Sequence, residues 1–219
     1  MHFDMTNFPF IKRLMRATSG VALIEFALSL PVILSMGLGG LELANYAIAT
    51  ERVSQIAMTA ADNAARVRSS IDELDVNEVM AGAKFVGSKI NFAQNGRIIL
   101  SSLEENAGKT GQWIRWQRCA GAKSATSSFG VQDAGKNDSS LPGMGPTGKK
   151  LAAVSGTAVM FVEVFYDYQP IVPMPSLGYG TKTMNFTAAF NVRERTDQAL
   201  KNAKNLTGAN ISSCSLYSA

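Results

Sequence analysis

A chain of 219 residues has room for one domain of ordinary size beside a membrane helix, or for two small domains. Its formal net charge is +4, and residues 1–20 supply half of it, because Lys12, Arg13 and Arg16 stand against Asp4 there. The rest of the chain carries only about +2 and has no basic block, which excludes the electrostatic footprint of a nucleic-acid-binding protein.

The first predicted element is an apolar helix over residues 21–41. Glu25 is the single charged residue among these 21 residues. At about 1.5 Å per residue the helix would be roughly 31 Å long, which matches the hydrocarbon core of a bilayer. A buried core helix of this length would normally have a polar face. We therefore predict that residues 21–41 span a membrane.

The flanks of this segment predict its orientation. Three basic residues precede it, whereas Glu42 follows and the next basic residue is Arg52. Short basic flanks stay in the cytoplasm, so the N-terminus should be cytoplasmic and the rest of the chain should lie outside, in the periplasm. A secretory signal peptide is cut after its apolar region. Here the small pair Ser19-Gly20 lies before that region, so cleavage there would leave the membrane helix on the mature protein.

The residues around this junction resemble the processing site of type IV prepilins. Gly20 is followed by Val-Ala-Leu-Ile-Glu25-Phe26, and prepilins are cut after the glycine, with a glutamate fifth in the mature chain. The continuation is closer to the TadE-like pseudopilins of tight-adherence (Flp-type) pilus systems. It includes Pro31, the glycines at 37, 39 and 40, Glu42 and the alanine pairs at 60–61 and 64–65. The resemblance covers residues 12–68.

The resemblance implies that a prepilin peptidase removes residues 1–20 as a leader. Cleavage would free the amine of Val21 at the membrane interface. The Glu25 carboxylate lies one helical turn away and can reach this amine, or that of a neighbouring subunit. An opposite charge offsets much of the several kcal/mol that a charge costs in hydrocarbon. We predict that this pair sets the register between subunits; the alternative is that Glu25 snorkels to the headgroups.

A helical pattern continues beyond the membrane segment, over residues 42–69. A single helix from 21 to 69 would be roughly 74 Å long. Its outer half has an apolar stripe that needs a partner, which in a pilin-like fold is a small antiparallel sheet of the same subunit; a free helical stalk is the alternative. The stripe recurs every three or four residues and consists of Tyr46, Val53, Ala57, Ala60, Ala64 and Val67.

Residues 70–219 are predicted to form the exported α+β domain. A helix is expected over 72–90, because acidic residues occupy its first turns and apolar residues share one face. Alternating apolar and polar residues predict an antiparallel sheet with one buried face. Its strands are expected over 97–103, 112–119, 160–168 and 183–193, the first two as a hairpin.

Two segments of this domain are predicted to lack regular structure. Residues 120–150 are rich in Gly, Ser, Ala and Lys, which favours a long exposed loop. Residues 143–150 of this loop approach a phosphate-binding motif, but Lys150 replaces the Ser or Thr that holds magnesium and no strand precedes the glycines. We therefore predict no nucleotide site. Residues 197–219 form a mainly polar tail.

Both cysteines, Cys119 and Cys214, lie outside the membrane segment. On the periplasmic side a disulfide is expected, and two free thiols are the alternative. Closing a loop of this length would contribute on the order of 4 kcal/mol in the chain-entropy model and would clamp the tail to the sheet. Two cysteines without a nearby histidine cannot fill a zinc shell, so neither a metal nor a cofactor is expected.

The sequence argues against catalysis. The single histidine, His2, lies in the leader, which removes Ser-His, Cys-His and His-metal chemistry from the exported domain. The carboxylate pairs Glu104-Glu105 and Glu163 with Asp167 are expected on solvated faces.

These features predict a minor pilin or pseudopilin of the bacterial inner membrane. Its partners would be a prepilin peptidase, other pilins and the pilus assembly machinery, with a role in surface adherence; whether it enters a surface pilus stays open. The alternative is an uncleaved, single-pass anchored scaffold or binding module in the periplasm, and an anchored enzyme ranks third.

Overall fold

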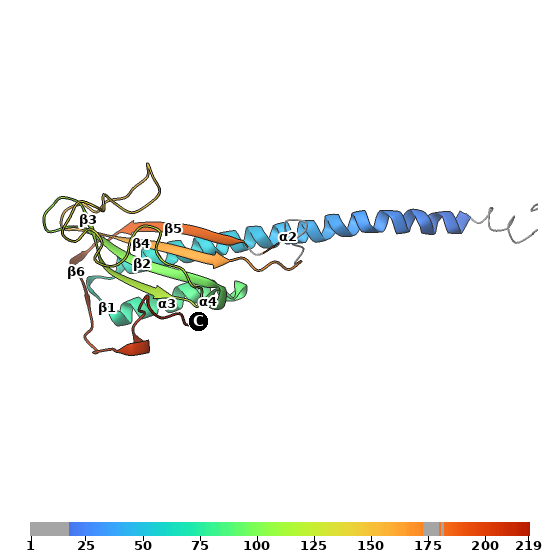
Figure 1. Ribbon diagram of the computed structural model, residues 1–219. Helices are drawn as coiled ribbons and strands as arrows, with labels where there is room; N and C mark the ends of the chain where they lie inside the picture. Colours follow the sequence, from blue (N-terminus) through green and yellow to red (C-terminus); the bar gives the residue numbers. More distant parts are fainter. Residues whose placement is uncertain (1–17, 173–179, 181) are drawn as a thin grey trace, which may run out of the picture. The chain divides into compact units, whose positions relative to one another are not determined.

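The computed structural model of the protein describes residues 18–172, 180 and 182–219. The chain divides into two compact units, Met1–Asn45 and Tyr46–Ala219. Most of the predicted leader, including its three basic residues, lies outside the described residues. The predicted class, an α+β protein with a long N-terminal apolar helix and a small antiparallel sheet, is confirmed (Figure 1).

The first described element is the helix α2, which runs from Thr18 to Arg66 and contains Pro31. Leucine and alanine, which favour helices, are frequent along it. The sequence predicted that the helix would continue to residue 69. It ends three residues earlier, because the chain passes into the strand β1, Ser69–Asp72, where Ser69 has a positive φ of 61°.

The second unit contains a four-stranded antiparallel sheet with the strand order β3-β2-β4-β5. All four strands were predicted, β4 and β5 from alternating apolar and polar residues, and β2 and β3 form the expected hairpin. The bounds of the strands are Gly96–Glu105 for β2, Gln112–Ala120 for β3, Ala158–Asp167 for β4 and Thr183–Asn191 for β5.

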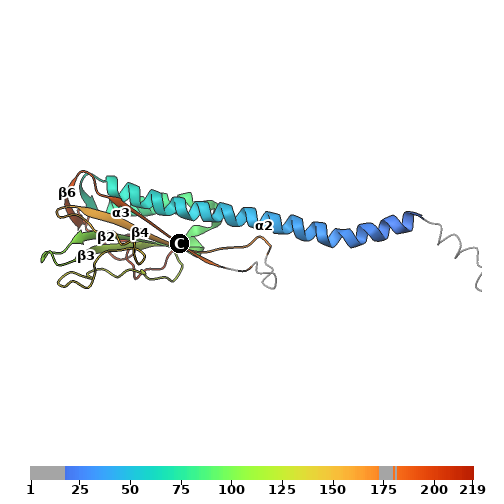
Figure 2. The same cartoon turned by 90° about the horizontal axis from the view of Figure 1, so that it is seen from above.

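The outer half of α2 packs on one face of this sheet (Figure 2). Val53, Ala57, Ala60 and Ala64 of the predicted stripe are at most 1% exposed. They share a core cluster with residues of β2 and β4, among them Leu100. Alanine leaves no long side chain between helix and sheet, so the two elements can approach closely. The expected packing of the stripe on the sheet of the same subunit is confirmed.

The helix α3, Glu73–Val86, covers the same core. Asp72 caps it, because its carboxylate accepts a hydrogen bond from the Leu74 amide and its own amide donates to Asp75. The sequence predicted one helix over 72–90. Instead the chain turns at Gly87, where a Cβ atom would lie 2.4 Å from that of Phe92. Two short helices follow, η2 over Ser88–Ile90 and α4 over Phe92–Asn95.

The other face of the sheet is covered by the segment between β3 and β4, residues 121–157. Leu141 and Met144 of this segment are buried against Leu103, Ile114 and other residues of the sheet. The sequence predicted an exposed loop over 120–150, and this is wrong for Leu141 and Met144, whereas Val131 is 61% exposed. The cause is a side chain–backbone network: for example, Gln112 donates to the carbonyl of Ala153 and accepts from its amide.

A second, two-stranded sheet was not predicted. β6, Arg195–Lys201, pairs in parallel with β1. The sequence assigned most of this strand to a polar tail. After β6 the described chain has one short helix, η4, over Gly208–Asn210.

Candidate functional site

The most distinctive surface of the first unit is the apolar side of α2. An 18-residue window of this helix has a mean hydropathy of 2.1, and none of its residues is buried. Leu23, Leu28 and Met36 are each at least 70% exposed. By length and composition the helix is able to cross a membrane. An apolar surface of this extent requires a cover, because water solvates it poorly.

The two serine hydroxyls within this surface are already satisfied by the helix itself. The hydroxyl of Ser29 donates to the carbonyl of Phe26 at 3.0 Å, and that of Ser35 donates to Val32 at 2.9 Å. Hydrocarbon offers no hydrogen-bonding partner, so an unsatisfied hydroxyl would cost several kcal/mol there. The surface is therefore chemically suited to lipid or to the apolar helix of another subunit.

The predicted processing residues lie in the first turns of α2. Gly20, Val21 and Glu25 are all exposed. Residues four apart share one face of a helix, so α2 places Val21 and Glu25 as neighbours about one turn apart. Cleavage after Gly20 and the pairing of Glu25 with a free amine stay predictions.

A disulfide joins Cys119 of β3 to Cys214 of the C-terminal tail, with an S–S distance of 2.05 Å. Next to it, the amide of Cys119 donates to the carbonyl of Ser212 at 2.8 Å. The tail is thus clamped to the sheet edge, as the sequence expected.

Arg97 forms a second clamp on the tail that sequence reasoning missed. Its buried guanidinium donates to the carbonyls of Cys214 and Leu216 at 2.7 and 2.6 Å, and to Gly121 at 2.8 Å. The ring of Tyr217 lies 4.2 Å from the guanidinium carbon. Burial lowers the pKa of Arg97 from its ordinary value. The sequence offered no signal beyond an arginine at the start of a strand.

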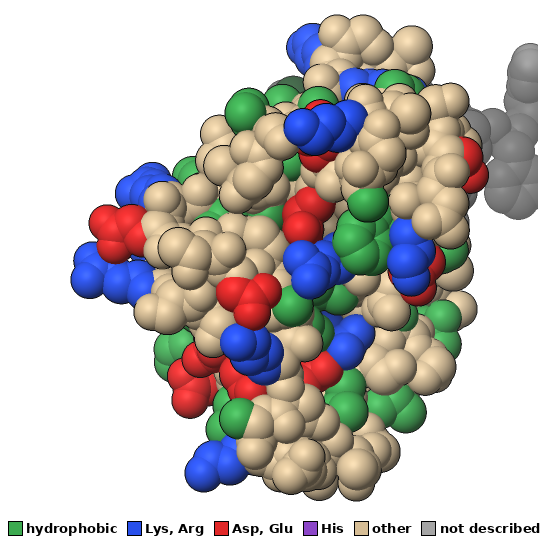
Figure 3. Space-filling model, turned by 90° about the vertical axis from the view of Figure 1, so that its left-hand side faces the viewer, with side chains coloured by type: hydrophobic (Ala, Val, Ile, Leu, Met, Phe, Trp, Pro, Cys, Tyr) green, Lys and Arg blue, Asp and Glu red, His purple; other side chains and the backbone are tan. Residues whose placement is uncertain are grey.

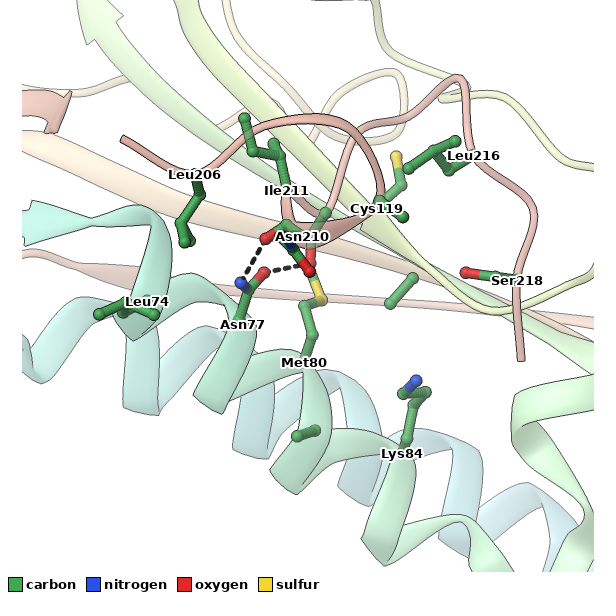
Figure 4. Close-up of a pocket in the computed structure, with 14 residues that line it drawn as sticks. Leu74, Asn77, Met80, Lys84, Cys119, Leu206, Asn210, Ile211, Leu216 and Ser218 are labelled. Carbon is green, nitrogen blue, oxygen red and sulfur yellow. Dashed lines mark hydrogen bonds between the residues drawn. The ribbon is translucent and has the colours of Figure 1, made fainter. Parts of the chain in front are cut away.

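A cavity of about 400 Å³ lies between α3 and this tail (Figure 4). Asn77 bridges its two walls, because its side chain donates to the carbonyl of Asn210 at 2.8 Å and accepts from the hydroxyl of Ser212 at 2.7 Å. Apolar residues such as Met80 and Ile211 line much of the remainder, and Lys84 lies at its side. This lining includes no carboxylate or histidine.

The carboxylates of the sheet depart from the sequence expectation. Glu104 and Glu163 were expected on solvated faces, but both are buried. Glu163 accepts hydrogen bonds from the hydroxyl of Ser127 and, at 2.8 Å, from the amide of Ser128. The physical reason is the cover that residues 121–157 form over β4. Burial raises the pKa of Glu163, and the bonds from the two serines oppose that rise.

This environment predicts a pH dependence of stability. Because the folded-state pKa of Glu163 lies above its ordinary value of 4.5, the folded chain binds this proton more tightly than the unfolded chain. The free energy of unfolding therefore falls as pH rises through the folded-state pKa. Glu163→Gln keeps an acceptor for Ser128 and should remove this component. Urea titrations between about pH 4.5 and 7.5 should show wild type losing stability relative to the variant as pH rises; a constant difference would contradict the assignment.

The described part of the second unit shows no metal cluster, and the face in Figure 3 shows no one-sided charge distribution. No three His, Cys, Asp or Glu side chains among the described residues are placed to hold a metal ion. On the face in Figure 3, basic and acidic side chains are intermixed. Ion pairs of the second unit include Arg118 with Glu73 and Arg115 with Glu104.

Comparison with known proteins adds one finding. The family described as TadE-like protein matches residues 20–66. No curated protein and no solved structure matches the chain. The matched residues are those of α2, from the glycine of the predicted processing site to the end of the helix. The resemblance inferred from the sequence is thus confirmed over these residues: the N-terminal helix of this chain is similar to that of TadE-like proteins.

Proposed function

We propose that this chain is a minor pilin or pseudopilin of a tight-adherence (Flp-type) pilus system and takes part in pilus assembly. Residues 21–41 would anchor it in the inner membrane, with the N-terminus in the cytoplasm and residues 70–219 in the periplasm. The TadE-like match supports an association with pili of this kind. Pilins are structural subunits, and the proposal includes no catalytic step.

One observation carries the proposal: an exposed apolar segment of membrane-spanning length, residues 21–41 of α2, follows Gly20 and has a single charge, Glu25, one turn beyond Val21. A soluble protein gains nothing from such a surface, whereas a subunit that is first held in a bilayer and then packed among apolar helices uses it in both states. If Val21 carries a free amine, the Glu25 carboxylate can form an ion pair with it.

Cleavage after Gly20 distinguishes the proposed pilin function from the alternative function of a periplasmic scaffold. An uncleaved, anchored periplasmic scaffold would have the same topology and the same exposed helix. The test is the N-terminal residue of the chain isolated from membranes of cells that contain a prepilin peptidase. The proposal predicts Val21, whereas the uncleaved scaffold begins at Met1.

A further inference from the structure

The two edges of the four-stranded sheet differ in how the described part of the chain covers them. β3 and β5 are the edge strands, and Figure 1 shows β5 along the upper edge. The outer edge of β3 is covered by backbone hydrogen bonds to residues 121–157 and to the tail. The amides of three β3 residues donate to carbonyls of these segments: Gln112 to Leu141, Ile114 to Ala134 and Cys119 to Ser212. No described residue forms such a bond to the outer edge of β5.

The register of β5 shows which of its backbone groups point outward. Bonds from Tyr168 to Lys182 and from Val192 to Ala158 lie at the two ends of the β4–β5 ladder. Since bonded positions alternate in an antiparallel pair, the even-numbered residues of β5 bond to β4. The odd-numbered residues therefore direct their amides and carbonyls away from the sheet. They are Thr183, Asn185, Thr187, Ala189 and Asn191.

β5 also lacks the features that usually protect an exposed edge. Its nine residues include no proline and no charged side chain, and its register with β4 has no bulge. Proteins normally blunt a free edge with lysine, proline or a bulge, because unpaired amides and carbonyls are a template for another strand. An unprotected edge beside a protected one indicates that β5 receives a strand.

The side chains of β5 define what the added strand would contain. Phe186, Ala188 and Phe190 are partly buried against the core beneath α2. Thr187 and its odd-numbered neighbours occupy the opposite face, since side chains alternate along a strand. An added strand would continue both surfaces, so it should present apolar side chains beside the phenylalanines and small polar ones on the other face.

Charges at the two ends of β5 distinguish between possible occupants. Lys182 and Arg193 flank the strand, both exposed, and neither has an ion pair in the described part of the chain. In a two-fold antiparallel pair of two copies centred on Thr187, Lys182 of one copy would lie opposite Val192 of the other. β5 contains no acidic residue, so a second copy of the strand would offer these two cations no carboxylate. A strand with acidic ends complements them.

We propose that the β5 edge binds an extended segment of another protein by strand addition. The segment has an uncharged, alternating apolar and polar centre and an acidic residue at each end. Main-chain hydrogen bonds to the odd-numbered residues would supply affinity, and the flanking charges would select the partner. This inference concerns the exported domain and does not depend on cleavage after Gly20.

Amide hydrogen exchange on the full, disulfide-bonded chain in detergent micelles tests the proposal. The probe is a synthetic peptide of alternating valine and threonine with an aspartate at each end; the control peptide carries lysine at each end. The acidic peptide should slow exchange at Asn185, Thr187 and Ala189 by tenfold or more and leave Phe186 and Ala188 unchanged. Absence of this alternation would overturn strand addition. If the odd-numbered amides exchange slowly without any peptide, and more slowly as the chain concentration rises, the edge binds a second copy of the chain instead.

Two sets of variants make the test specific. Thr187→Pro removes an outward amide without removing a bond to β4 and should weaken peptide binding by roughly tenfold, whereas Thr187→Val keeps the amide and should bind normally. The double variant Lys182→Glu, Arg193→Glu should weaken the acidic peptide by about fivefold and favour the lysine peptide. Equal binding of both peptides by wild type would overturn the acidic partner. Should Thr187→Pro fail to fold, the charge-reversal variant still decides the outcome.

Discussion

Removal of the disulfide should lower the free energy of unfolding of the second unit by about 4 kcal/mol. The bond between Cys119 and Cys214 closes a loop with a sequence separation of 95 residues, and the unfolded chain gains the entropy of that loop when the bond is absent. This is a large fraction of the 5–15 kcal/mol typical of a folded domain. The variant to use is Cys119→Ala, Cys214→Ala. Alanine is preferred to serine because Cys119 is 4% exposed, and serine would place a hydroxyl in this buried position.

The measurement is urea unfolding of the full chain in detergent micelles, with and without a reductant. Reduced wild type should match the double alanine variant, and the reductant should leave that variant unchanged. Arg97 still holds the carbonyls of Cys214 and Leu216 in both, so the tail should stay ordered under native conditions. An unchanged urea midpoint after reduction would show that Arg97 alone holds the tail and that the loop contributes little.

Glu25→Ala should reduce pilus assembly by tenfold or more while the chain still inserts into the membrane. If Val21 carries a free amine, the variant leaves that positive charge unpaired among apolar helices, at a cost of several kcal/mol. Insertion itself should improve slightly, because the apolar segment loses its single charge. The measurement compares the amount of pilin in sheared surface fractions with the amount in the membrane.

Two further variants separate charge from packing. Glu25→Gln keeps the size of the side chain and should assemble as poorly as Glu25→Ala if the charge matters. Ser29→Ala lies one turn further along α2 and removes only a hydroxyl that bonds to the helix itself, so it should assemble normally. Normal pilus output from Glu25→Gln would contradict the ion pair and favour the alternative in which Glu25 contacts headgroups.

The elements that the sequence predicted correctly are those with a long local pattern. The apolar run and the alanine stripe predicted α2 and its packing, because each turn of the helix repeats the same signal. The strands from 160–168 and 183–193 were found because apolar and polar residues alternate there. These two strands, β4 and β5, are neighbours in sequence as well as in the sheet, which favours their pairing with each other.

The features that the sequence did not predict depend on contacts between distant segments. β6 has little alternation, and its partner β1 lies more than 120 residues earlier in the chain. Burial of Glu163 depends on a cover formed by residues 121–157, whose composition suggested exposure. Arg97 resembles an ordinary polar residue at a strand end until the carbonyls of the tail are placed around it. No local pattern encodes such covers.

The predicted processing residues stand apart, because a motif rather than a fold identified them. Gly20, Val21 and Glu25 are ordinary exposed residues of a helix in the structure. Their proposed role rests on the TadE-like match at residues 20–66 and on the position of one charge in an apolar segment. The contacts they would form belong to an assembly rather than to a single chain.

The intact mass of the chain extracted from membranes tests the central claim most directly. It should be compared between cells with and without a prepilin peptidase, together with a Gly20→Val variant as the matched control. The account predicts a chain that begins at Val21 only when the peptidase is present and Gly20 is intact, and that begins at Met1 otherwise. A chain that begins at Met1 in all three samples, or one that is recovered without detergent from the soluble fraction, would contradict it.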